Sequence, residues 1–337
     1  MRIISLQGIV CVSGAIPAGA LVSAALLLCA ALVSVRSVRA ADPTVLVSSF
    51  MPAGEGGIQS FSLDMASGVL TAGPRSPAIP NPFFFDVSPD QQRLYSIHAE
   101  TFGGASAEAV AAFEFTGDVS LLRPLNRETT RGTASCFVEV DRSGRCLLVA
   151  NYSSGDVISY RIDSSGRLSA PVSFIQHAGR SVNTSRQSEP HAHCFVISPN
   201  NRFAYAADLG IDQIVCYRLN SETGELSTAE QAFVRLPPGS GPRHLTFHPK
   251  QPWMYVINEL LNTVTAFDWN AETGMLIERS TLSTLPADFK KESWCANMPG
   301  NNVQVFRIDA ESGNLEPAGG AVEIPMPSCI RILPGKP

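Results

Sequence analysis

The stretch "FVISPNNRFAYAADLGIDQIVCYRLNSETGELS" (residues 195–227) decides the fold of this chain. An apolar run is followed by a turn, a second apolar run, a polar loop, a third run and a turn that ends in Gly. Each run is short and rich in Val, Ile, Phe and Tyr, and Asn, Asp, Ser, Gly or Pro bounds it, which is typical of β-hairpins. Helical periodicity is nearly absent. The stretch therefore predicts consecutive antiparallel strands.

The same order of runs and turns recurs along the chain. Copies occur at 137–169 and 245–277, a looser copy at 83–122, and partial copies at 58–70 and 301–315. Four antiparallel strands in each repeat, at a period of about fifty residues, predict a β-propeller. An array of β-sandwiches is the alternative, but one fixed order of turns favours blades. We therefore expect an all-β propeller of four-stranded antiparallel blades.

Aromatic residues in the third run measure the spacing of the repeats. They are Phe61, Phe113, Tyr160, Tyr217, Phe267 and Phe306, at intervals of 52, 47, 57, 50 and 39 residues. The last interval is too short for an outer strand, a connection and two inner strands. The sequence thus predicts six blades or an incomplete ring, with an irregular junction near 290–300. The C-terminal run 328–333 could pair with 44–50 and close the ring, which would remove exposed sheet edges.

The composition and the N-terminal segment of the chain indicate what kind of protein it is. Of the 337 residues 45% are hydrophobic and 16% charged, and the net charge of −5 gives no reason to expect a nucleic-acid partner. Arg2, the apolar stretch 15–35 and the small residues Val38 and Ala40 predict a secretory signal peptide over 1–40, cleaved after Ala40. An uncleaved membrane anchor is the alternative, because about twenty apolar residues can span a bilayer.

Cleavage would leave 41–337 as one propeller domain, exported to the periplasm or the extracellular space. We expect this domain to be a monomer without a membrane partner. Its six cysteines, which show no CxxC pairs, are predicted to be buried free thiols. They are Cys136, Cys146, Cys194, Cys216, Cys295 and Cys329.

Hairpin geometry gathers polar residues on one face of the predicted ring. The start of the first strand and the end of the second lie side by side, opposite the turn. This places "PHAH" (190–193) beside "ADLG" (207–210), "GPRH" (241–244) beside "NEL" (258–260), and "TASC" (133–136) beside "ANYSSG" (150–155). The face collects His191, His193, Asp208, Arg243, His244, Asn258, Glu259, Asn151 and Tyr152. Such a group over a propeller axis suits a small anionic or polyhydroxylated ligand.

Each of these residues also has a structural explanation. A histidine at a strand start can bond a neighbouring backbone, Asp208 before Gly can form an Asx-turn, and Glu259 can be a solvated loop residue. Arg243 beside His244 is harder to explain, because a strand entry needs no two cationic groups. We expect no metal at His191 and His193, because alternate residues of an extended strand point to opposite sides.

Several linked segments resemble a known family. "EPHAHCFVISPNNRFAYAADLG", "GSGPRHLTFHPKQPWMYVINEL" with "NTVTAF", and "VANYSSGDV" are similar to the seven-bladed propeller lactonases. These comprise the propeller-type bacterial 6-phosphogluconolactonases and the fungal carboxy-muconate lactonizing enzymes. The resemblance spans most of 44–333 and implies a site without metal or cofactor, built from His, Arg and Glu, that acts on a lactone with an acidic group. It points to His191, His193, Arg243, His244 and Glu259.

The chain departs from the family pattern after "SWCA" (293–296), which runs almost directly into "NMPGNNVQVFRID" (297–309). By comparison with the family pattern, about one blade is missing there, roughly fifty to sixty residues. With it goes the arginine of an SNRG-type loop, which in this family would face the same pocket.

The resemblance implies hydrolysis of a sugar-acid lactone, with 6-phosphogluconolactone as the foremost candidate. His193 or Glu259 would activate water, and Arg243 and His244 would hold the anion. His191, Asp208, Asn151, Tyr152 and Asn258 are predicted to contact substrate. Two alternatives stay open: an enzyme acting on another carboxylated lactone, which the export signal favours, and a non-catalytic propeller that binds a sugar acid or a protein.

Overall fold

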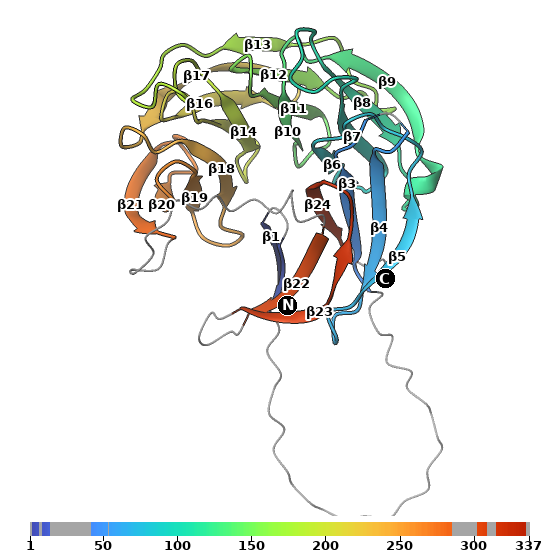
Figure 1. Cartoon of the computed structure of the whole chain (residues 1–337). Coiled ribbons are helices and arrows are strands. Elements are labelled where there is room, and N and C mark those ends of the chain that lie inside the picture. The colour runs from blue at the N-terminus through green and yellow to red at the C-terminus, as the bar shows by residue number, and fades with distance from the viewer. Residues whose placement is uncertain are drawn as a thin grey trace, which may run out of the picture.

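The computed structural model describes residues 2–6, 9–13, 42–52, 54–284, 302–308 and 315–334. The strands in these ranges form six four-stranded sheets, and five of the sheets are antiparallel throughout (Figure 1). A single 3-10 turn, Val119–Leu121, is the only helical element in the same ranges. The prediction of an all-β propeller with four-stranded antiparallel blades is confirmed.

The five antiparallel sheets are called blades 1 to 5. Blade 1 contains β24 (Pro327–Leu333), β3 (Thr44–Ser49), β4 (Gly57–Leu63) and β5 (Leu70–Arg75). Blade 2 contains β6 (Phe85–Val87), β7 (Arg93–His98), β8 (Ala109–Glu114) and β9 (Arg123–Thr129). Blade 3 contains β10 (Ser135–Val140), β11 (Cys146–Asn151), β12 (Asp156–Arg161) and β13 (Ser173–Gln176). Blade 4 contains β14 (Ala192–Ile197), β15 (Phe203–Asp208), β16 (Gln213–Asn220) and β17 (Glu225–Arg235). Blade 5 contains β18 (Pro242–Phe247), β19 (Trp253–Asn258), β20 (Thr263–Trp269) and β21 (Leu276–Ser283).

The two ends of the propeller sequence meet in blade 1. β24 pairs antiparallel with β3, from Pro327 opposite Ser49 to Leu333 opposite Thr44. The Phe50 N–H adds a bond to the Met326 carbonyl at 2.9 Å. The predicted pairing of 328–333 with 44–50 is therefore confirmed, and the C-terminal strand supplies the inner edge of the first blade.

The aromatic residues used to count the repeats occupy equivalent places. Each lies on the third strand of its sheet, on β4, β8, β12, β16, β20 and β22 (Asn302–Ile308). Spacing in the sequence therefore located six third strands correctly, including the one after the short interval.

The sixth sheet differs from the blades. Its order is β1 (Arg2–Leu6), β2 (Ile9–Ser13), β22 and β23 (Leu315–Glu323), and β2 runs parallel to β22. The stretch 15–35, the cleavage site at Ala40 and the junction 285–301 lie outside the described residues. None of the helical structure in the described ranges is long and apolar enough to cross a bilayer.

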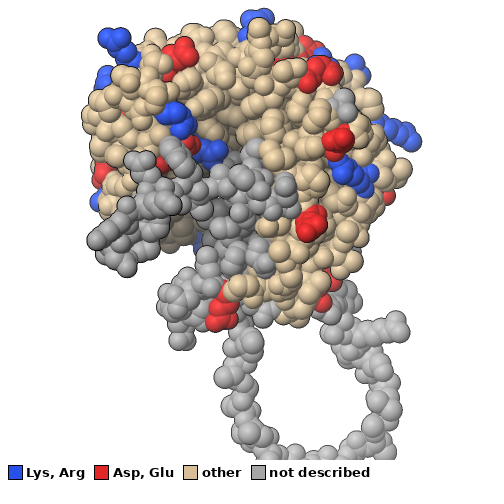
Figure 2. All heavy atoms as spheres, viewed as in Figure 1, with Lys and Arg blue, Asp and Glu red and all other residues tan. Residues whose placement is uncertain are grey.

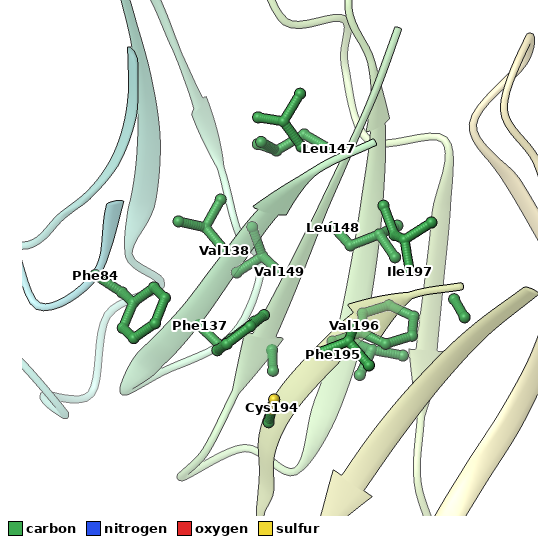
Figure 3. Close-up of a cluster of buried hydrophobic side chains, with 14 of the residues drawn as sticks. Phe84, Phe137, Val138, Leu147, Leu148, Val149, Cys194, Phe195, Val196 and Ile197 are labelled. Atoms are coloured by element: carbon green, nitrogen blue, oxygen red, sulfur yellow. The ribbon is translucent and has the colours of Figure 1, made fainter. Parts of the chain in front are cut away.

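The core lies between neighbouring blades. Figure 3 shows Phe84, Phe137, Val149 and Phe195 among the side chains that pack together across blades 2 to 4. All six positions of β11, β14 and β15 are buried, as expected for strands covered on both faces. Five cysteines are buried free thiols, as predicted, and Cys295 lies outside the described residues.

Tyrosines on second strands link one blade to the next. The Tyr95 hydroxyl of blade 2 donates to the Gly166 carbonyl of blade 3 at 3.1 Å. The Tyr205 hydroxyl of blade 4 donates to the Gly274 carbonyl of blade 5 at 2.7 Å. Tyr255 holds the equivalent place on β19, but it is partly exposed, and no described residue hydrogen-bonds its hydroxyl.

Candidate active site

β-Bulges at one equivalent place define the innermost strands. The register shifts between Ser135 and Phe137 in β10, between Ala192 and Cys194 in β14, and between Pro242 and His244 in β18. The extra residues are Cys136, His193 and Arg243. A bulge redirects a side chain that regular alternation would send elsewhere. The three bulged residues all face one cavity.

That cavity has a volume of about 230 Å³. It is lined by Phe83, Phe102, Cys136, Tyr152, Arg186, His193, Arg243 and Glu259. Pockets for drug-sized ligands measure about 300–1,000 Å³, so this cavity suits a smaller molecule. Figure 2 shows basic side chains at the central hollow of the ring, while acidic and basic groups are interspersed on the rim.

A larger cavity of about 660 Å³ lies where β16 ends and β17 begins. Its lining includes Arg202, Arg218 and Glu225, but none of the predicted site residues. It lies at the turn ends of the strands, away from the bulges. The smaller cavity is therefore the candidate site.

Two arginines hold the carboxylate of Glu259. Its Oε1 accepts from Arg186 Nη2 at 2.8 Å, and its Oε2 pairs with Arg243 Nε at 2.9 Å. The exposed fraction of the Glu259 side chain is 18%, and that of Arg243 is 25%. A guanidinium keeps its charge at any working pH, so these three groups carry a formal charge of +1.

His193 faces the cavity as a neutral imidazole. Only 6% of the residue is exposed, and its Nδ1 has no hydrogen-bond partner in the described ranges. Burial, together with the charges of Arg243 and His244, lowers the pKa of His193 well below its ordinary value. Its ring packs edge-on against Tyr152, with ring centroids 5.5 Å apart. The predicted catalytic residues His193, Arg243 and Glu259 are thus brought together.

His191 supports Tyr152 and is not among the residues that line the cavity. The two rings stack with centroids 4.6 Å apart, and His191 Nδ1 lies 2.9 Å from the Tyr152 carbonyl oxygen. The hydroxyl of Tyr152 accepts from Arg186 Nη2 at 3.3 Å. Tyr152 lines the cavity as predicted, whereas His191 acts by holding it.

His244 lies beside His193 but does not line the cavity. It packs against Phe84 and Phe137, and burial with the charges of Arg243 and Arg331 lowers its pKa to about 3. The imidazole of His244 is therefore neutral and adds no positive charge to the cavity. The role predicted for His244 in an anion clamp with Arg243 stays a prediction, and His244 is not among the residues that line the cavity.

Three predicted substrate contacts lie inside the blades instead. Asn151 and Asp208 are 0% exposed and Asn258 is 1% exposed. Asn151 donates to the Thr130 carbonyl at 3.0 Å, and Asp208 accepts the His191 N–H at 2.7 Å. Asn258 donates to two threonine hydroxyls of β20, each at 2.9 Å. We correct these three predictions, because side chains that secure strand ends cannot also reach substrate.

Sequence reasoning missed four residues of the cavity wall: Phe83, Phe102, Cys136 and Arg186. Arg186 belongs to segment 177–191 between β13 and β14, which has no counterpart in the other repeats. Cys136 holds in the bulge of β10 the position that His193 holds in β14 and Arg243 in β18. An alignment of the "TASC", "PHAH" and "GPRH" segments could therefore have found it. In the described part of the chain, no three His, Cys, Asp or Glu side chains lie close enough together to hold a metal ion.

Fold and site together define a β-propeller with a small, positively charged cavity at one end of its axis. Residues 44–299 match the family model described as Lactonase, 7-bladed beta-propeller. The chain belongs to this lactonase family, and the resemblance stated from the sequence is confirmed.

Similarity to proteins named as lactonases supports this family assignment. The chain is 32% identical over 288 residues to a 6-phosphogluconolactonase of Bacillus subtilis, covering 80% of this chain and 78% of the relative. It is 28% identical over 215 residues to a 6-phosphogluconolactonase of Formosa agariphila, covering 63% and 60% of the two chains. The structure of the Pseudomonas aeruginosa periplasmic gluconolactonase PpgL superposes with a TM-score of 0.77 at 23% identity, covering 87% of this chain and 99% of PpgL. That similarity concerns the fold.

Proposed function

We propose that this protein hydrolyses the ring ester of a small acidic sugar lactone such as 6-phosphogluconolactone. One observation carries the proposal: Arg243, Arg186, Glu259 and His193 converge on a cavity of about 230 Å³. The names of the Bacillus subtilis and Formosa agariphila relatives support the same reaction class.

The reaction needs an activated water and a donor for the developing oxyanion. In the proposed mechanism, neutral His193 removes a proton as the water oxygen bonds to the lactone carbonyl carbon. The guanidinium of Arg243 donates to the carbonyl oxygen as it gains negative charge. The ring C–O bond then breaks, and the proton on His193 passes to the departing oxygen, which leaves an open-chain hydroxy acid.

We assign the base to His193 instead of Glu259 because of the partners of each group. Both carboxylate oxygens of Glu259 already contact guanidinium groups, whereas the His193 ring lines the cavity and forms no ion pair in the described ranges. Glu259 then serves as a bridge that fixes the positions of the two arginines.

Steady-state hydrolysis of 6-phosphogluconolactone by purified variants tests these roles. We expect His193→Asn to lower kcat by about 10²–10⁴-fold, as for loss of a general base. Arg243→Ala should lower kcat by about 10²–10³-fold, as for loss of an oxyanion donor. His248→Asn, outside the cavity, serves as the control. Full activity in Arg243→Ala would overturn the mechanism, and full activity in His193→Asn with loss in Glu259→Gln would move the base to Glu259.

We also propose that the chain is exported after cleavage at Ala40, as the signal-like N-terminus indicates. Intact-mass measurement of the protein from the native cell should then give a chain that begins at Ala41. Such a chain lacks β1 and β2, so its sixth sheet would retain β22 and β23. A mass that includes residues 2–40 would reject cleavage.

A further inference from the structure

Arg186 reaches the cavity from the loop that precedes blade 4. Its Nη2 lies 2.8 Å from Glu259 Oε1 and 3.3 Å from the Tyr152 hydroxyl. Its side chain is 33% exposed, compared with 25% for Arg243. The side chain of Arg186 is therefore the more exposed of the two.

A buried clamp fixes the distance between these arginines. Gln187, 0% exposed, donates to the Leu209 carbonyl at 2.8 Å and to Asp212 Oδ1 at 2.7 Å. Asp212 Oδ1 also accepts the Gly241 N–H at 2.7 Å. Gly241 has φ +60°, which favours glycine, and it precedes Arg243 by two residues. One carboxylate thus ties together the two segments that carry Arg186 and Arg243, a support that preorganises a binding site.

The two arginines have different neighbours. Arg243 is the bulged residue beside His193, and it lowers the pKa of His193 more than Arg186 does. Arg186 contacts Tyr152 at the more exposed side of the cavity. The reacting carbonyl therefore belongs near His193 and Arg243, and the far end of a bound lactone lies toward Arg186 and Tyr152.

The net charge of the cavity indicates which chemical group the far end of the lactone carries. Arg186 and Arg243 contribute two positive charges, Glu259 contributes one negative charge, and His193 is neutral. A neutral ligand would leave the surplus positive charge of the cavity uncompensated. A ligand with a phosphate or carboxylate compensates it, and a planar guanidinium matches the oxygens of both groups.

We infer that Arg186 is the substrate-binding residue for the acidic group of the lactone, placed for this role by the Gln187–Asp212 clamp. This inference rests on the proposed function, because it assigns the acidic end of the same substrate. Arg186 takes the place in the anion clamp that the sequence had suggested for His244.

The test compares an acidic lactone with its neutral counterpart. The kcat/KM for 6-phosphogluconolactone and for unphosphorylated gluconolactone is measured on wild type, Arg186→Gln, Arg186→Lys and Arg180→Gln. Arg180 is exposed on the same loop, so Arg180→Gln makes the same charge change outside the cavity. A purely structural role of Arg186 would lower both rates alike.

We expect Arg186→Gln to lower the preference for the phosphorylated lactone by roughly 10- to 100-fold, which is the value of a charge-assisted hydrogen bond. Its kcat/KM for gluconolactone should fall by a clearly smaller factor, because the neutral lactone lacks the acidic group that Arg186 binds. Arg186→Lys should retain part of the preference, and Arg180→Gln all of it. An unchanged preference in Arg186→Gln, or in Arg186→Lys where the Gln variant does not fold, overturns the inference.

Calorimetric binding of inorganic phosphate separates this inference from the proposed function. If wild type hydrolyses neither lactone, the proposed function fails. Phosphate binding that is lost in Arg186→Gln and retained in Arg180→Gln still supports the anion site. Phosphate that binds both variants equally, or does not bind wild type, overturns it.

Discussion

Blades 4 and 5 share one order of apolar runs and turns but are packed differently. In β14 and β15 every position is buried, whereas in β19 buried and partly exposed positions alternate. Blade 5 also carries Leu261 at 46% and Leu282 at 69% exposure. Alternating burial is typical of a sheet covered on one face, and continuous burial of one covered on both. The comparison shows that repeat sequence alone does not fix burial, because burial also requires a neighbouring blade.

The candidate site spans both blades. His193 comes from the fully packed blade 4, and Arg243 and Glu259 come from blade 5. The ion pair between Glu259 and Arg186 joins blade 5 to the loop before blade 4. The geometry of the candidate site therefore depends on contacts between the fully buried strands of blade 4 and the partly exposed strands of blade 5.

The largest effect should come from matched tyrosine truncations. We expect Tyr205→Ala to lower the free energy of unfolding by about 3–5 kcal/mol, as for other buried aromatic residues. Tyr255→Ala should cost less than about half as much, because its ring is partly exposed. Urea unfolding measures both. Equal losses would contradict the comparison and place Tyr255 in an equally packed environment.

Acidic pH should lower the free energy of unfolding, because the imidazole of His244 in blade 5 takes up a proton more readily in the unfolded chain. The pKa of His244 is about 3 in the folded chain and about 6.5 in the unfolded chain, so the unfolded chain binds the extra proton between these values. Stability therefore falls as the pH falls below about 6.5, by about 2 kcal/mol for this residue at pH 5.

Denaturant unfolding of His244→Gln at pH 7 and pH 5 checks this dependence. The variant lacks the titrating imidazole, so it should lose less stability than wild type over the same interval. His248→Asn keeps His244 and should follow wild type. A variant that remains as acid-sensitive as wild type would assign the effect to His193 or to other groups.

The smallest effect concerns the tyrosine hydroxyls alone. Tyr205 donates to Gly274 and accepts from Trp269 Nε1 at 2.8 Å, so Tyr205→Phe should cost about 1 kcal/mol. Tyr255→Phe should change stability by less than about 0.5 kcal/mol, as expected for a surface change. Thermal unfolding of the two variants sharpens the comparison, and a clear loss in Tyr255→Phe would reveal a partner for that hydroxyl.

The fold could be predicted from the sequence because its determinants are local and repeated. Short runs, turn residues and third-strand aromatics recur in one order, so each blade could be located separately. The pairing of the two ends in blade 1 was also predictable, since 328–333 was an unpaired strand at the end of the chain and 44–50 opened the first blade.

The site was only partly predictable. Strand pairing correctly placed His193, Arg243 and Glu259 near one another, but the bulges that direct the first two into the cavity have no clear sequence signal. Asn151, Asp208 and Asn258 share the same strand-end position, where a polar side chain can turn into the blade. Arg186 lies in a loop outside the repeat, so no internal comparison could mark it.

The tyrosine on the second strand has a consequence for how such a ring can change its size. Tyr95 and Tyr205 each anchor the Gly-containing turn of the following blade, whereas the equivalent positions of β3 and β11 hold Leu46 and Leu148. Tyr255 carries the same attachment point at the end of blade 5. An additional repeat inserted after Ser283 would thus find its first anchor already in place.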